Sequence, residues 1–94
     1  MITEGDFCDA ISHLWHGYEV DELGWVCEPD DVVWTADTLE HFIEASGPAF
    51  EKINTPPGIL YVWENQQSRK GKARGNLYVM DAGDHRWAYF DGEV

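Results

Sequence analysis

An alternation of side chains in the last third of the chain constrains the fold more than any other feature. Residues 59–64, 76–81 and 86–91 each alternate with a period of two, and aromatic residues occupy many of these positions. A loop containing the basic residues 69–74 joins the first two segments, and residues 82–85 join the last two. A period of two is typical of β-strands, and such connections are typical of antiparallel neighbours. These segments are therefore predicted to form a three-stranded antiparallel meander.

The N-terminal segment has helical periodicity instead. Thr3 has the side chain of an N-cap, acidic residues follow it in the first turn, and Gly17 is suited to end the helix. The apolar residues that recur at helical spacing in between are Phe7, Ala10, Ile11, Leu14 and Trp15. We expect one amphipathic helix here.

A second helix is predicted before the meander. Asp37 followed by Glu40 resembles a capping box, although Thr35 competes as the N-cap. Its apolar stripe consists of Leu39, Phe42 and Ile43. Gly47 and Pro48 then close the helix, Phe50 and Ile53 extend the pattern by one more turn, and residues 55–58 break the chain.

Between the two helices the sequence favours a β-hairpin. Residues 25–27 and 32–34 are rich in β-forming side chains, and residues 28–31 are suited to a type I turn. The predicted class is α+β: two helices packed on a small antiparallel sheet, which consists of this hairpin and the C-terminal meander. Both helices are expected to cover one face of the sheet, and residues 1–94 are expected to form a single domain.

The composition bears on the compartment in which the protein is expected to work. Apolar residues make up 44% of the chain, which is enough for a core, and the longest purely apolar run is far too short to span a bilayer. No signal peptide is visible at the start. The two cysteines, Cys8 and Cys27, are therefore interpreted as reduced thiols of a cytoplasmic protein, although a single bridge between them is geometrically possible.

No motif indicates an enzyme. His13 and His16 are three residues apart on the first helix and Asp9 lies one turn earlier, but zinc needs three or four ligands and no ligand spacing is present. Cys8 lies between acidic neighbours, which raise a thiol pKa and disfavour the nucleophilic thiolate. We therefore expect no catalytic residue, no metal and no cofactor.

Charge is distributed very unevenly along the chain. Thirteen of the eighteen acidic residues precede Lys52, which is the first basic residue, and the net charge is −12. Four of the six basic residues lie together within residues 69–74. The chain is too acidic overall to bind nucleic acid unaided or to bind an anionic membrane. The basic loop is best interpreted as a solvated hairpin tip; contact with an acidic patch of the partner or with a bound RNA phosphate is the alternative. The asymmetry indicates an interaction surface for a basic partner.

The sequence therefore favours an acidic, non-enzymatic inhibitor or decoy. It would bind a basic nuclease or another nucleic-acid-binding protein and occlude its groove, as anti-CRISPR, anti-restriction and toxin-immunity proteins do; the likeness is one of charge and size only. The expected partner-binding residues are Asp21, Glu22, Glu28, Asp30, Asp31, Asp37, Glu40 and Glu44. Glu40 and Glu44 repel each other one turn apart on the second helix, which suggests that their charge is kept for its field.

Three alternatives remain open at this point. The charge is also explained by solubility or by a halophilic source. Most of the five Trp residues are expected in the core, but one or two exposed at a sheet edge would make a small accessory or assembly module. The third alternative is a metal-dependent enzyme that uses His13 and His16.

Overall fold

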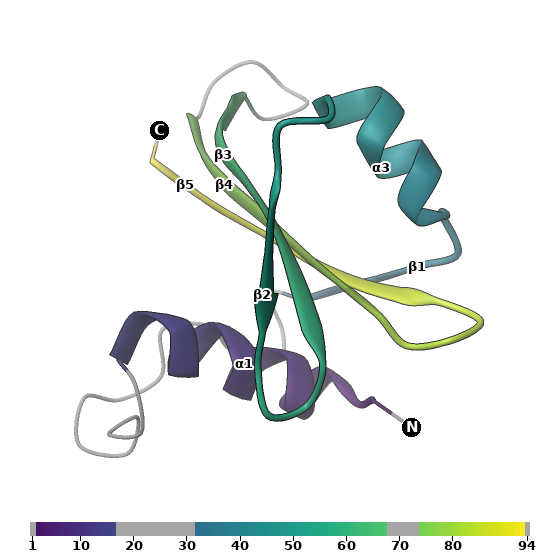
Figure 1. Ribbon diagram of the computed structural model, residues 1–94, viewed down its shortest axis with the longest axis vertical. Helices are drawn as coiled ribbons and strands as arrows, with labels where there is room; N and C mark the ends of the chain where they lie inside the picture. The colour runs from purple at the N-terminus through teal and green to yellow at the C-terminus, as the bar shows by residue number, and fades with distance from the viewer. Residues whose placement is uncertain (1, 17–31, 68–73, 94) are drawn as a thin grey trace.

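A computed structural model describes residues 2–16, 32–67 and 74–93 (Figure 1). Its helices and strands are, in chain order, α1 (Glu4–His16), β1 (Val33–Thr35), α3 (Leu39–Ser46), β2 (Glu51–Asn54), β3 (Ile59–Gln67), β4 (Arg74–Asp81) and β5 (Arg86–Glu93). The fold class is α+β, as predicted. None of the helices in this described part is long and apolar enough to cross a membrane.

The strands form one antiparallel sheet in the order β1-β5-β4-β3-β2. The predicted meander is confirmed as β3, β4 and β5. The prediction that Phe50 and Ile53 extend a helix is wrong, because Ile53 lies in β2 and pairs with Leu60. Residues 55–58 reverse the chain into β3: the Thr55 N–H donates to the Gly58 carbonyl and the Gly58 N–H donates to the Thr55 carbonyl.

β1 is an edge strand whose described partner is β5, with Trp34 opposite Trp87. It corresponds to the second strand of the predicted hairpin. The first strand and the turn of that hairpin, residues 25–31, lie outside the described residues. Among the described residues, β1 therefore pairs with β5, the strand farthest from it in the sequence.

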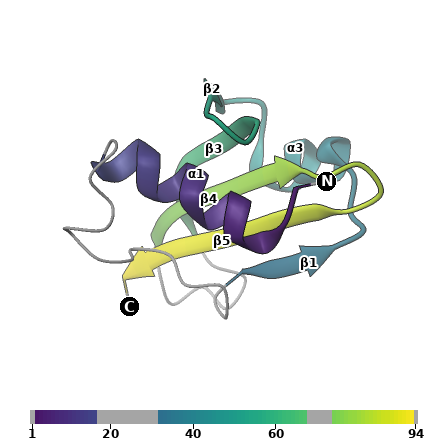
Figure 2. The same cartoon turned by 90° about the horizontal axis from the view of Figure 1, so that it is seen from below.

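The two helices lie on opposite faces of the sheet, so the expectation that both cover one face is wrong (Figures 1 and 2). Residues of α1 pack with Leu60 and Val62 of β3, whereas Phe42 of α3 packs with Trp63. Successive residues of a strand point to opposite faces, and here both sets are apolar. A sheet of this kind needs cover on both sides.

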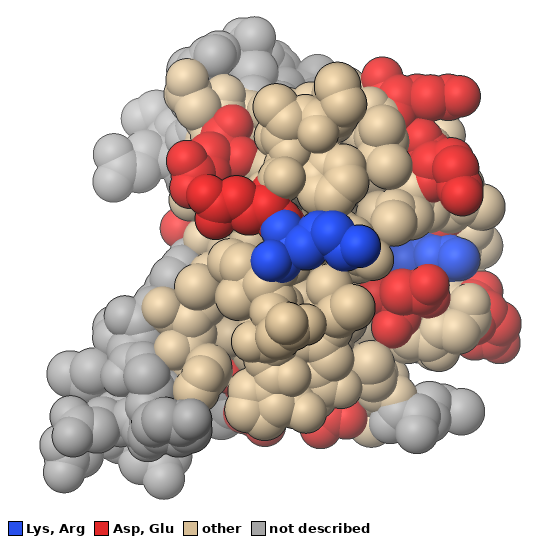
Figure 3. All heavy atoms as spheres, in the orientation of Figure 1, with Lys and Arg blue, Asp and Glu red and all other residues tan. Residues whose placement is uncertain are grey.

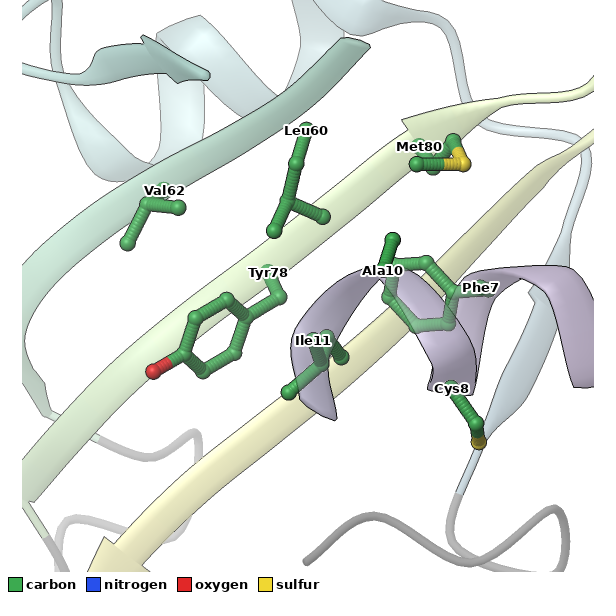
Figure 4. Close-up of a cluster of buried hydrophobic side chains, with 8 residues drawn as sticks. All are labelled: Phe7, Cys8, Ala10, Ile11, Leu60, Val62, Tyr78 and Met80. Carbon is green, nitrogen blue, oxygen red and sulfur yellow. The ribbon is translucent and has the colours of Figure 1, made fainter. Parts of the chain in front are cut away.

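On the α1 face the core is closed. Phe7, Cys8, Ala10, Ile11 and Ser12 have no exposed surface. Figure 4 shows the apolar members of this group beside the side chains of β3 and β4 that complete the cluster. The helix start is as predicted: the Asp6 N–H donates to Thr3 Oγ1 (3.1 Å) and the Thr3 N–H donates to Asp6 Oδ2 (3.0 Å). These reciprocal bonds satisfy two N–H groups that a helix start otherwise leaves open.

The start of α3 differs from the prediction. Its N-cap is Thr38, whose Oγ1 accepts a hydrogen bond from the His41 N–H (3.2 Å), and not Asp37. Thr35, the other predicted candidate, is not the N-cap either. Its Oγ1 accepts a hydrogen bond from the Asp37 N–H, before the helix begins. The predicted end is confirmed: Gly47 has a φ of 93°, which favours glycine, and its N–H donates to the Ile43 carbonyl.

Candidate functional site

A groove of about 500 Å³ lies on the α3 face, between α3 and the edge strand β1. Its apolar lining consists of Val33 from β1, Phe42 and Ala45 from α3, Leu77 from β4, and Ala88 and Phe90 from β5. This volume is within the range of about 300–1,000 Å³ that is typical of ligand pockets. The groove is therefore large enough to receive one or more bulky apolar groups.

The position of α3 explains why the groove is open. Phe42 packs on Trp63 of β3 with ring centroids 6.4 Å apart, and Phe50 packs on the same indole. The Trp63 Nε1–H donates to the Gly47 carbonyl at 2.7 Å and so ties the C-terminal end of α3 to β3. On β5 the short side chain of Ala88 occupies the position between Val79 of β4 and Val33 of β1. The helix therefore covers the β3 side of this face and leaves the β5–β1 side uncovered.

A β-bulge contributes the polar end of the groove. The register of β3 against β4 shifts between Trp63 and Gln66, and Asn65 in this bulge has a positive φ of 55°. One extra residue reverses which face the following side chains occupy. Gln66 is thereby placed on the same face as Trp63, and it lines the groove.

An acidic residue and a histidine line the groove where it meets solvent. Asp37 Oδ2 lies 3.9 Å from His41 Nε2, and both side chains are substantially exposed. The Asp37 backbone is held by the hydrogen bond that its N–H donates to Thr35 Oγ1. Of the described residues that line the groove, none is Lys or Arg. The rim is thus suited to a cationic group.

The acidic residues of the second helix lie where the sequence predicts them to be, at the surface. Glu40 and Glu44 are exposed, and they are one turn apart on one side of α3. Figure 3 shows acidic side chains gathered at the upper right, over α3. We call Asp37, Glu40 and Glu44 together the acidic face of α3. The other five predicted partner-binding residues, Asp21, Glu22, Glu28, Asp30 and Asp31, lie outside the described residues, as do residues 69–73 of the basic loop.

β1 exposes two large apolar side chains. Val33 is 58% exposed and Trp34 is 57% exposed. Trp34 stacks on His85, with ring centroids 5.5 Å apart, and His85 in turn makes an edge contact with Trp87. Trp63 is fully buried and Trp87 is half-buried, as expected of core tryptophans. Trp34 is therefore an exposed indole whose orientation is restrained by a neighbouring ring.

Sequence reasoning missed the pair of Asp84 and His85. His85 is buried, and its Nδ1 lies 2.6 Å from Asp84 Oδ1. An ionised carboxylate only accepts hydrogen bonds, so Nδ1 carries the proton. This hydrogen bond and the charge interaction with His85 hold the pKa of the Asp84 carboxyl below its ordinary value. The adjacency of Asp84 and His85 in the sequence is their only signal, and it says nothing of the rings of Trp34 and Trp87 around the imidazole.

The described residues do not form a metal site. Within residues 2–16, 32–67 and 74–93 no group of three or more His, Cys, Asp or Glu residues is arranged to hold a metal ion. Cys8 is completely buried on the α1 face, and Cys27 lies outside the described residues. Neither protein-family models nor curated proteins nor solved structures match this chain.

Proposed function

We propose that this chain is a non-enzymatic binding protein that docks on a basic protein through the acidic face of α3. The partner would be a nuclease or another nucleic-acid-binding protein, and the bound chain would occlude its nucleic-acid groove by bulk and by charge. The observation that carries the proposal is the exposed pair of Glu40 and Glu44 beside an open apolar groove. Interfaces combine an apolar centre with a polar rim, and this arrangement has both.

The energetics of α3 support the proposal. Glu44 lies in the last turn, where the helix dipole disfavours an anion, and that turn contains no basic residue. Glu40 and Glu44 also repel each other one turn apart, which costs a few tenths of a kcal/mol. Acidic residues that weaken their own helix are accounted for if their field steers a basic partner.

The first test is a capture experiment with the tagged chain. An extract of the source cells is nuclease-treated and captured at low salt and again at about 0.5 M salt, where exposed charges are strongly screened. We expect a basic nucleic-acid-binding protein that is retained at low salt and lost at high salt. Its purified form then serves for affinity measurements.

Glu44→Lys is the decisive substitution, because stability and binding should change in opposite directions. It removes a repulsion, creates a Glu40–Lys pair in the favourable order and complements the helix dipole. We expect a gain of about 0.5–1 kcal/mol in the free energy of unfolding. We also expect about threefold to tenfold weaker binding of the captured partner.

Glu51→Lys is the matched control. It makes the same charge change at an exposed position on β2, at the opposite edge of the sheet from β1. Its affinity should stay close to that of the unchanged chain. Equal losses in the two variants would mean that only net charge matters, and no loss in Glu44→Lys would remove the acidic face of α3 from the proposal.

A second candidate function is favoured by Trp34. An exposed, restrained indole on an edge strand is typical of a binding hot spot, as in a small accessory or assembly module. Such a module binds mainly through apolar contacts. A partner that is retained at about 0.5 M salt and lost on Trp34→Ala would support this second candidate over the first.

A further inference from the structure

We propose that the groove beside α3 is the docking site for an apolar side chain of the partner, aromatic or long and aliphatic, that is flanked by Lys or Arg. This inference rests on the proposed function and deepens it. It assigns to the partner a short basic segment with one apolar anchor, in place of a uniformly basic surface.

The groove has the size and lining for such an anchor. Its volume of about 500 Å³ exceeds what one large side chain needs, and its floor is formed by Leu77, Ala88 and Phe90. Val33 at one wall is 58% exposed, although it is a large apolar residue. Burying apolar surface is the main favourable term in association, so an apolar side chain that enters here gains from both walls and the floor.

The charge around the groove selects the residues that flank the anchor. Asp37 lines the groove, and Glu40 and Glu44 lie on the same helix. The two basic side chains that the structure describes are engaged elsewhere: Lys52 lies over the Tyr61 ring, and Arg86 Nε is 3.6 Å from Asp81. Lys and Arg beside the anchor would therefore meet acidic residues, with no Lys or Arg among the described residues that line the groove, and acidic flanks would be repelled.

The walls are built before a partner arrives. The Trp63–Gly47 hydrogen bond fixes the end of α3, and the Thr35–Asp37 hydrogen bond fixes the link from β1 to α3. Binding sites that need no ordering keep more of their interaction energy as affinity.

The test uses three synthetic peptides with blocked ends. The first has one Phe flanked on both sides by Lys, the second replaces that Phe with Ser, and the third replaces every Lys with Glu. Affinities are measured by fluorescence anisotropy of labelled peptide, and backbone amide NMR locates the contact. We expect the Phe–Lys peptide to bind about tenfold more tightly than its Ser counterpart, because a buried Phe gains at least that much. The Glu peptide should not bind.

Two substitutions of alanine by tryptophan test whether the Phe side chain of the peptide binds in the groove. Ala45→Trp puts an indole on α3 at the groove, whereas Ala49→Trp puts the same indole at an exposed position outside its lining. We expect Ala45→Trp to bring the Phe peptide down to the affinity of the Ser peptide, and Ala49→Trp to leave the tenfold difference intact. The amide shifts should fall on Val33, Phe42 and Ala45.

The outcomes separate this inference from the proposed function. Equal binding of the Phe and Ser peptides, with both weakened by Glu44→Lys, would overturn the groove inference and leave the acidic face of α3 in place. Equal binding of the Lys and Glu peptides would overturn the proposed function. Self-association that is blocked by Ala45→Trp would show that a second copy of the chain fills the groove, and would overturn the inference as well.

Discussion

On one face of the sheet α1 buries five residues completely, whereas on the other face α3 has Phe42 as its one buried residue. Both helices are amphipathic, and both pack against apolar strand residues. α1 has 13 residues and α3 has 8, and α3 is anchored toward β3. The shorter helix therefore leaves part of its face uncovered, and this uncovered part is the groove.

The difference indicates that one face of the sheet mainly stabilises the fold and that the other is available for binding. The α1 face stabilises the fold, because five residues of α1 are completely removed from water there. The α3 face contributes less to the fold and presents an apolar floor, an acidic helix and an exposed edge strand. If this division holds, substitutions on the α1 face should change stability alone, and those at the groove should change binding more than stability.

The largest expected effect compares Phe7→Ala with Phe42→Ala. Phe7 is completely enclosed, so its removal leaves a cavity and should lower the free energy of unfolding by about 3–5 kcal/mol. Phe42 borders the groove, where less new cavity is created, and its removal should cost about 2 kcal/mol. Urea unfolding of both variants measures the difference.

Equal losses in these two variants would contradict the comparison, because they would mean that α3 is packed as tightly as α1. A chain of 94 residues has only about 5–15 kcal/mol of stability, so Phe7→Ala is expected to be severely destabilised. If it does not fold, Phe7→Leu and Phe42→Leu repeat the comparison with smaller changes in volume. The larger loss is again expected at Phe7.

A smaller effect is expected at the two N-caps. Thr3→Ala removes the bond from the Asp6 N–H, and Thr38→Ala removes the bond from the His41 N–H. Each should lower the free energy of unfolding by about 1 kcal/mol. Only Thr38→Ala loosens a wall of the groove, so only this variant should weaken binding of the Phe–Lys peptide. A similar loss of affinity in Thr3→Ala would show that the two faces are not independent.

The sequence alone predicts the α1 start, the meander and the exposed acids of α3, because each depends on periodicity or on neighbours a few residues away. It does not predict which face each helix covers. Leu60 and Val62 on one face of β3, and Tyr61 and Trp63 on the other, are all large and mainly apolar. The alternation pattern therefore does not indicate that a different helix covers each face.

The groove depends on contacts distant in sequence: β1 pairs with β5, and the bulge at Asn65 redirects Gln66. The orientation of Trp34 likewise depends on a contact distant in sequence, its stacking on His85.

The smallest expected effect concerns Asp84, in the turn between β4 and β5. His85, which Asp84 holds by hydrogen bonding, contacts Trp34 of β1 on one side and Trp87 on the other. Trp87 belongs to the α1 side, where its Nε1–H donates to the Ile2 carbonyl. The Asp84 carboxylate therefore orients the imidazole that packs between the Trp34 and Trp87 indoles.

The pH dependence of Asp84→Asn tests this link. Because the folded-state pKa of Asp84 is lowered, the unfolded chain binds more protons near the ordinary carboxyl pKa of about 3.9. The stabilisation is then complete above that value and is lost as the pH falls through the lower folded pKa. Thermal unfolding from about pH 5 downward should show the unchanged chain more stable than Asp84→Asn at the upper end, with the difference shrinking as the pH falls below the ordinary carboxyl pKa. If Asp84 acts on Trp34 through His85, the indole N–H resonance of Trp34 shifts in Asp84→Asn as well. A stability difference that is constant with pH, or an unshifted Trp34 resonance, would confine the role of Asp84 to the β4–β5 turn.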